Sequence, residues 1–258
     1  MIRFLILHII LFFGITVHAQ YLTTSGKEIL DKNGSPVLLQ GVGLGGWMLQ
    51  EPYMMNVIGG ASNQQEFRSK LESLIGMTNT QEFYDNWLDN FVTKTDIDSI
   101  ASWGFNSVRL PMHYNLFTLP IEDEVQGENT WLTKGFDMVD ALLDWCHENQ
   151  LYLILDLHAA PGGQGYNADI SDYDTSKYSL WESGANQDKT VELWKRLSKR
   201  YKNEEWVAGY DLINEPNWNL PGNKLLKELY VRITDVIRAE GDEPVSYTHL
   251  TLPTTPYV

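Results

Sequence analysis

The stretch Val207–Pro216, VAGYDLINEP, decides the fold. Its apolar residues predict a short buried strand, and Pro216 ends that strand because proline has no backbone N–H to donate to a strand ladder. The last two residues before the proline are Asn214 and Glu215, an amide and a carboxylate. In a parallel sheet these side chains would stand at the edge where α/β proteins carry their chemistry. The plainer interpretation, a solvated strand end that turns into a loop, stays open at this point.

Three earlier stretches are predicted to be strands of the same sheet. They are GVGLGGW at 41–47, FNSVRLP at 105–111 and LYLILDLH at 151–158. The last is almost wholly apolar, which is typical of a strand covered on both faces. Each ends in, or is soon followed by, a polar side chain: Glu51, Arg109 and His158.

Helical patterns separate these strands. Apolar spacing and helix-end signals predict helices over Gln64–Ile75, Gln81–Trp103, Leu132–Asn149, Asp188–Tyr201 and Lys224–Ala239. Near the start, Asn33-Gly34 between two apolar runs predicts a β-hairpin. The alternation of strand and helix predicts a parallel sheet with right-handed crossovers, built from four strand–helix units in one domain.

The first 19 residues have the pattern of a signal peptide, with Arg3 ahead of an apolar run and small residues before a cut after Ala19. We therefore expect a secreted or periplasmic protein that leaves the membrane once the signal is cleaved. An uncleaved anchor is the alternative, although the apolar run is short for a membrane span. Cys146 is the only cysteine, so no disulfide within the chain is expected.

The composition limits the classes of binding partner that this protein is expected to have. The formal net charge of −15 argues against nucleic acid and against an anionic membrane surface. Nine Trp and thirteen Tyr offer many flat amphipathic faces, which suit sugar rings as well as a core. A neutral ligand fits this composition. Separately, we expect the intact protein to be a monomer.

Glycoside hydrolysis fits four polar groups gathered at one edge of a sheet. It requires a carboxylic acid that protonates the leaving oxygen and a second carboxylate that attacks or activates water. Glu215 could be the acid/base, and Arg109 could keep a partner carboxylate ionised. Asn214 and His158 could hydrogen-bond sugar hydroxyls.

Two other classes stay open. A metal-dependent hydrolase could use Asp156, His158, His113 and Glu215 as ligands, although outside the tail the mature chain has only three histidines and one of them is on a predicted helix. A carbohydrate-binding protein without catalysis would need the aromatic residues but not Arg109 beside Asn214 and Glu215. Activity assays with and without a chelator distinguish the metal-dependent hydrolase from the metal-independent glycoside hydrolase. Binding of a sugar without turnover would favour the carbohydrate-binding protein.

Four motifs, taken in order, resemble one known family: GVGLGGWMLQEP at 41–52, VRLP at 108–111, DLHAAPGGQGY at 156–166 and INEP at 213–216. Over residues 21–243 the chain is similar to glycoside hydrolase family 5, the cellulase family of retaining (β/α)8 barrels, and most closely to its exo-β-1,3-glucanase-like branch. The resemblance implies hydrolysis of a β-1,3- or β-1,4-glucan without a cofactor. It implies roles for Glu215 as acid/base, Asn214 at the 2-hydroxyl, Arg109 beside the nucleophile, and His158 and Glu51 in the catalytic subsite, with Trp218 and Trp181 as stacking or packing residues.

The resemblance also implies parts that this sequence does not contain. The family places its nucleophile on the seventh strand, whereas only four strand–helix units precede Gly241. We therefore expect residues 20–244 to be a partial catalytic domain, an open half-barrel that is inactive by itself. Its fifth-strand position should be empty, and Leu153, Leu155 and Leu212 should be partly exposed. Residues 245–258 resemble translated sequencing adapter, and we expect them not to be native.

Overall fold

A computed structural model describes residues 22–57, 59–125, 127–242 and 246–247 of the 258-residue chain. The expected signal peptide and nearly all of the expected non-native tail lie outside these residues, so both stay predictions. In the described part, no helix is long and apolar enough to cross a membrane.

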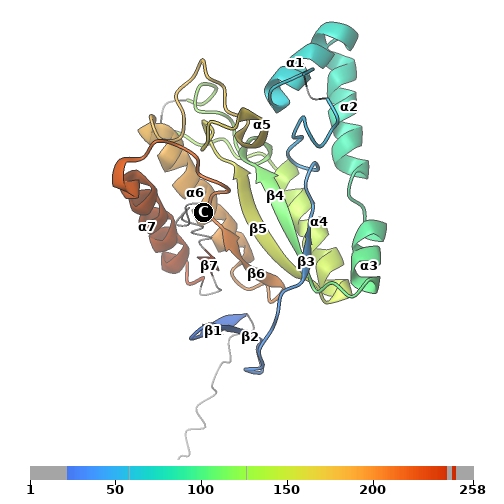
Figure 1. Ribbon diagram of the computed structural model, residues 1–258, viewed down its shortest axis with the longest axis vertical. Helices are drawn as coiled ribbons and strands as arrows, with labels where there is room; N and C mark the ends of the chain where they lie inside the picture. Colours follow the sequence, from blue (N-terminus) through green and yellow to red (C-terminus); the bar gives the residue numbers. More distant parts are fainter. Residues whose placement is uncertain (1–21, 58, 126, 243–245, 248–258) are drawn as a thin grey trace, which may run out of the picture.

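The main sheet has five parallel strands in the order β3–β4–β5–β6–β7 (Figure 1). Each connection therefore moves one strand along the sheet, as in a (β/α)8 barrel. The described strands form an open arc, which confirms the predicted class, an α/β half-barrel. The strand bounds are β3 Gly41–Gly43, β4 Ser107–His113, β5 Tyr152–Ala159, β6 Val207–Asp211 and β7 Ser246–Tyr247.

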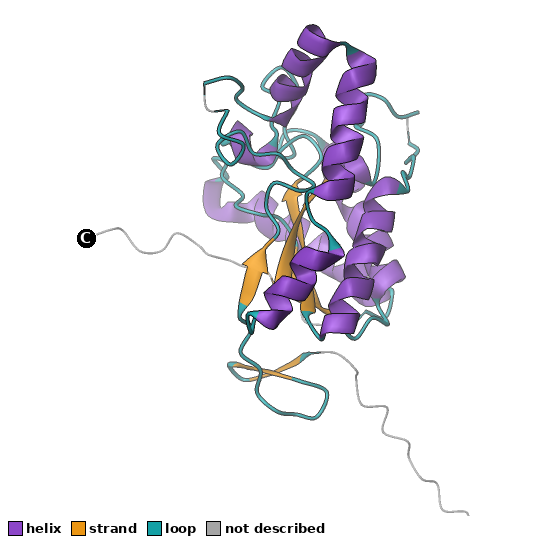
Figure 2. Ribbon diagram, turned by 90° about the vertical axis from the view of Figure 1, so that its right-hand side faces the viewer, coloured by secondary structure: helices purple, strands orange, loops and turns teal. Residues whose placement is uncertain are grey.

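Helices follow the strands and line one side of the sheet (Figures 1 and 2). A separate helical hairpin, α1 and α2, is inserted between β3 and α3 and stands at the upper right of Figure 1. Two predicted helices, α1 and α7, have the predicted bounds. The helices are α1 Gln64–Ile75, α2 Met77–Asn90, α3 Lys94–Ser102, α4 Lys134–Asn149, α5 Ala168–Ser171, α6 Gly184–Tyr201 and α7 Lys224–Ala239, with short 3₁₀ turns η1 Tyr114–Leu116 and η2 Pro221–Asn223.

The single helix predicted over Gln81–Trp103 is wrong. The chain forms two helices, α2 and α3, because Thr93 starts a new one with a capping box. Its side chain accepts from the backbone N–H of Asp96, whose carboxylate accepts in turn from the backbone N–H of Thr93. Such reciprocal bonds satisfy N–H groups that a helix start would otherwise leave unpaired.

The strand predicted over 105–111 does not end at Pro111, because β4 continues to His113. Arg109 gives its carbonyl to the N–H of Leu44 on the β3 side, and Pro111 faces that same side two residues later. Since β3 ends at Gly43, the missing proline N–H breaks no ladder bond there. The strand predicted at 41–47, in contrast, is shorter than expected, because β3 spans only Gly41–Gly43.

The leucines expected to be partly exposed are buried, so that expectation is wrong. Leu153 and Leu155 are 0% exposed and Leu212 is 1% exposed. Along β5, side chains alternate between the two faces, and Asp156 points toward the site described below. Leu153 and Leu155 therefore point to the opposite face, where the helices cover them without help from further strands. Each such burial stabilises the fold by about 1.5–3 kcal/mol.

The expectation of an empty fifth-strand position is also wrong, because Ser246–Tyr247 pairs in parallel with Tyr210 and Asp211 of β6. Pairing of this kind uses backbone groups, so it does not require the apolar run that the sequence lacks there. At the N-terminus, β1 (Thr23–Ser25) and β2 (Glu28–Leu30) form a hairpin that was not predicted. The predicted turn at Asn33-Gly34 joins β2 only to an isolated bridge from Leu30 to Pro36.

Candidate active site

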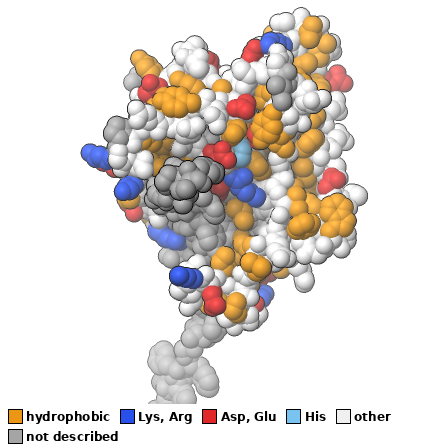
Figure 3. Space-filling model, viewed as in Figure 1, with side chains coloured by type: hydrophobic (Ala, Val, Ile, Leu, Met, Phe, Trp, Pro, Cys, Tyr) orange, Lys and Arg blue, Asp and Glu red, His pale blue; other side chains and the backbone are white. Residues whose placement is uncertain are grey.

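Three neighbouring strands bring polar side chains to one face at the end of the sheet. The register places Asp156 of β5 between Pro111 of β4 and Asp211 of β6. Arg109 lies two residues before Pro111, so its side chain leaves the sheet on the same face. Figure 3 shows basic, acidic and histidine side chains side by side in the middle of the molecule. The predicted polar edge exists, and it includes two aspartates beside the predicted arginine.

Arg109 is the centre of this cluster. Its Nη2 donates to Asn214 Oδ1 at 2.7 Å and lies 2.9 Å from Asp211 Oδ2 and 3.0 Å from Asp156 Oδ2. The side chain of Asp156 is fully buried, whereas a third of the Arg109 side chain is exposed. Asp156 Oδ1 has no hydrogen-bond partner among the described residues. Burial raises the pKa of Asp156, because a carboxylate loses hydration there.

His158 lies between two acidic side chains. Its Nδ1 is 2.6 Å from Asp156 Oδ2, and its Nε2 is 3.4 Å from Glu51 Oε1. Burial lowers the pKa of His158, but the hydrogen bonds to Asp156 and Glu51 outweigh burial and raise the pKa to about 9. Asn214 Nδ2 is 3.3 Å from the same Nε2. The ring nitrogen can therefore donate to Glu51 when protonated and accept from Asn214 when neutral.

The backbone beside Asn214 is held by a buried amide. Gln164 Nε2 donates to the carbonyl oxygens of Asn214, at 2.9 Å, and His158, at 2.7 Å. Gln164 also accepts the backbone N–H of Ala160. One side chain in the glycine-rich loop after β5 thus ties together the ends of β5 and β6, which keeps the predicted Asn214 and His158 at contact distance.

Glu51 enters the cluster from the loop after β3, as predicted, and its side chain is only 4% exposed. Tyr53 follows two residues later and is half exposed. A hydrogen bond to Glu51, with smaller contributions from burial and from the charges of Glu51, Asp169 and Glu215, raises the pKa of Tyr53 to about 12. Tyr53 therefore keeps its phenolic proton at neutral pH and acts as a donor beside Glu51.

Glu215 differs from its neighbours in both exposure and backbone conformation. Its side chain is exposed and has no hydrogen bond among the described residues. Its φ of +41° lies in the left-handed region, although it precedes Pro216, where extended conformations are favoured. A backbone of this kind costs on the order of 1–3 kcal/mol and is concentrated at functional sites. Glu215 thus stands at the rim of the cluster with a free carboxylate.

Aromatic rings flank the chain just after Glu215. Trp218 stacks on Tyr166 with ring centroids 4.1 Å apart and an interplanar angle of 12°, and Tyr173 meets Trp218 edge-on at 5.2 Å. Trp218 is half-buried, whereas Tyr166 is 55% exposed. Trp181 is buried and donates to the carbonyl oxygen of Gln164. The exposed ring face at this rim therefore belongs to Tyr166, supported from behind by the predicted Trp218.

The histidines of the metal alternative belong to two different groups. His158 contacts Asp156, whereas His113 Nε2 lies 2.9 Å from Asp172 Oδ2. Among the described residues, no three His, Cys, Asp or Glu side chains are placed to share one metal ion.

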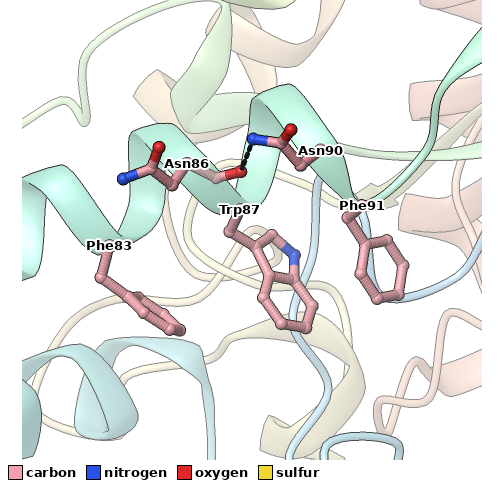
Figure 4. Close-up of a pocket in the computed structure, with 5 residues that line it drawn as sticks. All are labelled: Phe83, Asn86, Trp87, Asn90 and Phe91. Atoms are coloured by element: carbon pink, nitrogen blue, oxygen red, sulfur yellow. Dashed lines mark hydrogen bonds between the residues drawn. The ribbon is translucent and has the colours of Figure 1, made fainter.

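A separate hollow of about 390 Å³ is lined by side chains of α2 and of Phe91, which follows it (Figure 4). Three aromatic side chains at four-residue spacing point the same way from the helix, and two asparagines line the rest. None of the predicted site residues contributes to it. The lining residues are Phe83, Asn86, Trp87, Asn90 and Phe91.

Sequence reasoning missed four residues of the site or gave them another role. Asp156 was considered only as a metal ligand, although its position two residues before His158 puts both side chains on one face of β5. Asp211 follows the same rule within β6. Tyr53 stands two residues after Glu51, but in a loop this spacing predicts nothing. Gln164 lies in a glycine-rich loop without periodicity, so the sequence carried no signal for it.

The exposed Glu215 lies where α/β barrels carry their catalytic groups, at the carboxyl end of a parallel strand. A carboxylic acid in that place is one of the two groups that glycoside hydrolysis requires. A model of the cellulase family, glycosyl hydrolase family 5, matches residues 62–257. The chain belongs to this family.

Curated relatives and solved structures are similar over most of this chain. It is 37% identical over 197 residues to a beta-xylosidase of Phanerodontia chrysosporium, covering 76% of this chain and 39% of that protein. It is 29% identical over 212 residues to a probable glucan 1,3-beta-glucosidase A of Aspergillus clavatus, covering 78% and 47%. The crystal structure of rutinosidase from Aspergillus niger covers 78% of this chain and 57% of its own, with a TM-score of 0.57 at 18% identity, which supports the fold alone. The chain spans less than half the length of these two curated relatives.

Proposed function

We propose that this chain carries the acid/base side of a retaining active site that hydrolyses a β-glucan. The observation that carries the proposal is the exposed, strained Glu215 beside the Arg109–Asn214–His158 cluster at the strand ends. Family membership supports hydrolysis of a glycosidic bond, and the resemblance to exo-β-1,3-glucanases supports the residue roles.

In a retaining mechanism a second carboxylate bonds to the anomeric carbon as the glycosidic bond breaks, and water later cleaves the resulting glycosyl ester. Glu215 gives its proton to the departing glycosidic oxygen in the first step. Its carboxylate then takes a proton from the water that completes hydrolysis. Asn214, fixed by Arg109 and by Gln164, offers an amide to the 2-hydroxyl of the reacting sugar. Glu51 and His158 bind further hydroxyls of the same ring, because His158 contacts Asn214 and Glu51 contacts His158.

A neutral, flat ligand suits the rim of this site. The exposed face of Tyr166, backed by Trp218, can stack on a pyranose ring on the leaving-group side of Glu215. The names of the relatives point to glucose-based and xylose-based substrates, and we place β-1,3- and β-1,4-glucans first because of the sequence motifs. The pattern of residues 1–19 supports action outside the cytoplasm, in the periplasm or after secretion.

The test is a chimera in which residues 22–242 replace the matching half of a fungal glucan 1,3-β-glucosidase. We expect the chimera to hydrolyse β-glucan oligosaccharides with retention of the anomeric configuration. NMR spectra of the first-formed product measure that configuration. Glu215→Gln should slow hydrolysis about 10²–10⁴-fold, and less for aryl glycosides with good leaving groups, because these need little protonation. Glu204→Gln, at the exposed opposite end of β6, is the matched control and should have no effect.

Equal rates for Glu215→Gln and the unmodified chimera would contradict the acid/base assignment. Hydrolysis of xylan in preference to glucan would move the substrate to a pentose. If the chimera binds oligosaccharides tightly but does not hydrolyse them, and the 258-residue chain does the same in calorimetry, the protein is a binding module.

A further inference from the structure

A buried carboxylate outside the strand-end cluster belongs to Asp172, just after α5. Asp172 is 5% exposed and has a left-handed backbone, with φ of +50°. Its Oδ2 lies 2.9 Å from His113 Nε2 at the end of β4, and its Oδ1 accepts the backbone N–H of Gln65 at 3.0 Å. Both carboxylate oxygens therefore have partners, on two different elements.

The proton between His113 and Asp172 is fixed by a third bond. His113 Nδ1 accepts the backbone N–H of Asn115 at 3.1 Å, so the hydrogen of the neutral ring sits on Nε2 and is donated to Asp172. An amide in place of the carboxylate would point a donor at this donor, or would lose the Gln65 bond. The two contacts together therefore require that both terminal atoms of the residue 172 side chain be hydrogen-bond acceptors.

Asp172 and its neighbour hold the first turn of α1. Gln65 Nε2 donates to the backbone carbonyl of Asp172 at 3.0 Å, and Asn63 Nδ2 donates to that of Tyr173 at 3.1 Å. Asn63 is also the N-cap of α1, where its side chain accepts from Glu66 N–H. The start of the α1–α2 hairpin is therefore fastened to the loop between β5 and α6 by side chains and backbone together.

The same turn reaches the active site through one more bond. Gln64 Oε1 accepts the backbone N–H of Gln50 at 2.7 Å, and Gln50 immediately precedes Glu51. Glu51 is the acid that faces His158 Nε2. The other end of the network touches the rim, because Tyr173 packs edge-on against Trp218. A continuous set of contacts thus runs from His113 to Glu51.

We propose that Asp172 is a positioning residue that sets Glu51 against His158 by anchoring the first turn of α1. The inference rests on the proposed function only for what Glu51 then does to a sugar. Asp172 itself touches neither His158 nor Glu215 in the described contacts, so it acts through the loop that precedes Glu51.

The test reads the position of Glu51 without any substrate. The charged groups that face His158 are Asp156, Glu51 and Arg109, and the hydrogen bond that His158 donates to Glu51 raises the pKa of His158. NMR titration of the His158 ring in the 258-residue chain should therefore show a lower pKa in Glu51→Gln. Asp172→Asn, which keeps a side chain that tolerates φ > 0, should lower it to a comparable extent. The double variant should show no further fall, because both changes remove one interaction.

A second variant keeps the test decisive if Asp172→Asn does not fold. Gln64→Ala removes only the acceptor for Gln50 N–H on a half-buried side chain, and we expect it to lower the His158 pKa as well. Glu124→Gln, which breaks a buried ion pair with no link to this network, should leave that pKa unchanged. An unaltered pKa in Gln64→Ala, or additive effects of Asp172→Asn and Glu51→Gln, would overturn the proposal.

Oligosaccharide binding separates this inference from the proposed function. If the unmodified chain binds β-glucan oligosaccharides, Asp172→Asn should weaken binding as much as Glu51→Gln does, and normal binding in Asp172→Asn would count against positioning. If the His158 pKa falls as expected while the chimera with unmodified residues 22–242 neither binds nor hydrolyses β-glucan oligosaccharides, the positioning role stands and the proposed function fails.

Discussion

Two buried ionic groups in this molecule differ in how completely they are satisfied. In the first, Lys189 Nζ lies 2.6 Å from Glu124 Oε1 and 2.9 Å from Thr118 Oγ1. Glu124 also accepts the N–H and the hydroxyl of Thr130, and both charged side chains are less than 5% exposed. In the second group, at the strand ends, Asp156 Oδ1 has no partner among the described residues and Glu215 is open to solvent.

The difference separates a structural group from a candidate active site. Lys189 of α6 binds Glu124 in the loop between η1 and α4, and Thr130 of the same loop donates two further hydrogen bonds, so the burial of charge is compensated. At the strand ends, the fold tolerates an incompletely compensated carboxylate and a strained glutamate. Such local costs are typical where stability is given up for binding or chemistry.

The largest expected effect on stability comes from breaking the satisfied group. Lys189→Ala should lower the free energy of unfolding by about 3–5 kcal/mol, because it leaves Glu124 buried without its cation. The control is Arg232→Ala, which removes an exposed pair with Asp188 and should cost no more than about 0.5 kcal/mol. Urea denaturation of the 258-residue chain measures both, and equal losses would break the comparison.

Neutral replacements of the two buried acids, Glu124 and Asp156, should lower the free energy of unfolding by different amounts. Desolvation raises the pKa of Glu124, but the bonds from Lys189 and Thr130 outweigh it and lower the pKa to about 2, so the fold favours the charged form. Glu124→Gln should therefore cost about 1.5–3 kcal/mol. Burial raises the pKa of Asp156, so the fold favours its neutral form, and Asp156→Asn should change stability by less than about 1 kcal/mol. A larger loss for Asp156→Asn in the same denaturation assay would reverse this interpretation.

The smallest expected effect is the pH dependence of each group. The lowered pKa of Glu124 gives stability that is full above its ordinary value of 4.5 and is lost as pH falls through about 2. The raised pKa of His158 gives stability that is full below its ordinary value of 6.5 and is lost as pH rises through about 9. Denaturation across pH measures how much each variant lowers the free energy of unfolding. The loss caused by Glu124→Gln should shrink at acid pH, and the loss caused by His158→Gln should shrink at alkaline pH. Both differences shrinking at the same end would contradict the two assignments.

The sequence by itself determined the parallel α/β arrangement and most of the polar edge. Strand runs that end in Arg109, His158 and Asn214-Glu215 are local patterns, and parallel strands bring their ends together whatever the loops do. Two helices, α1 and α7, were predicted with the observed bounds because their apolar spacing and end signals agree. The break between α2 and α3 was also local, in Thr93 and Asp96, and was overlooked.

Only the tertiary structure decided which of these groups meet and how. The strand register, which no local pattern specifies, placed Asp156 and Asp211 around Arg109. The side of β5 that carries Leu153 and Leu155 was settled by the helices packed on it, so these residues are buried in an open sheet. The long-range bonds of Gln164 and Asp172 come from loops whose conformation depends on elements distant in sequence. Sequence patterns report residues near in the chain, whereas hydrogen bonds, burial and charge depend on nearness in space.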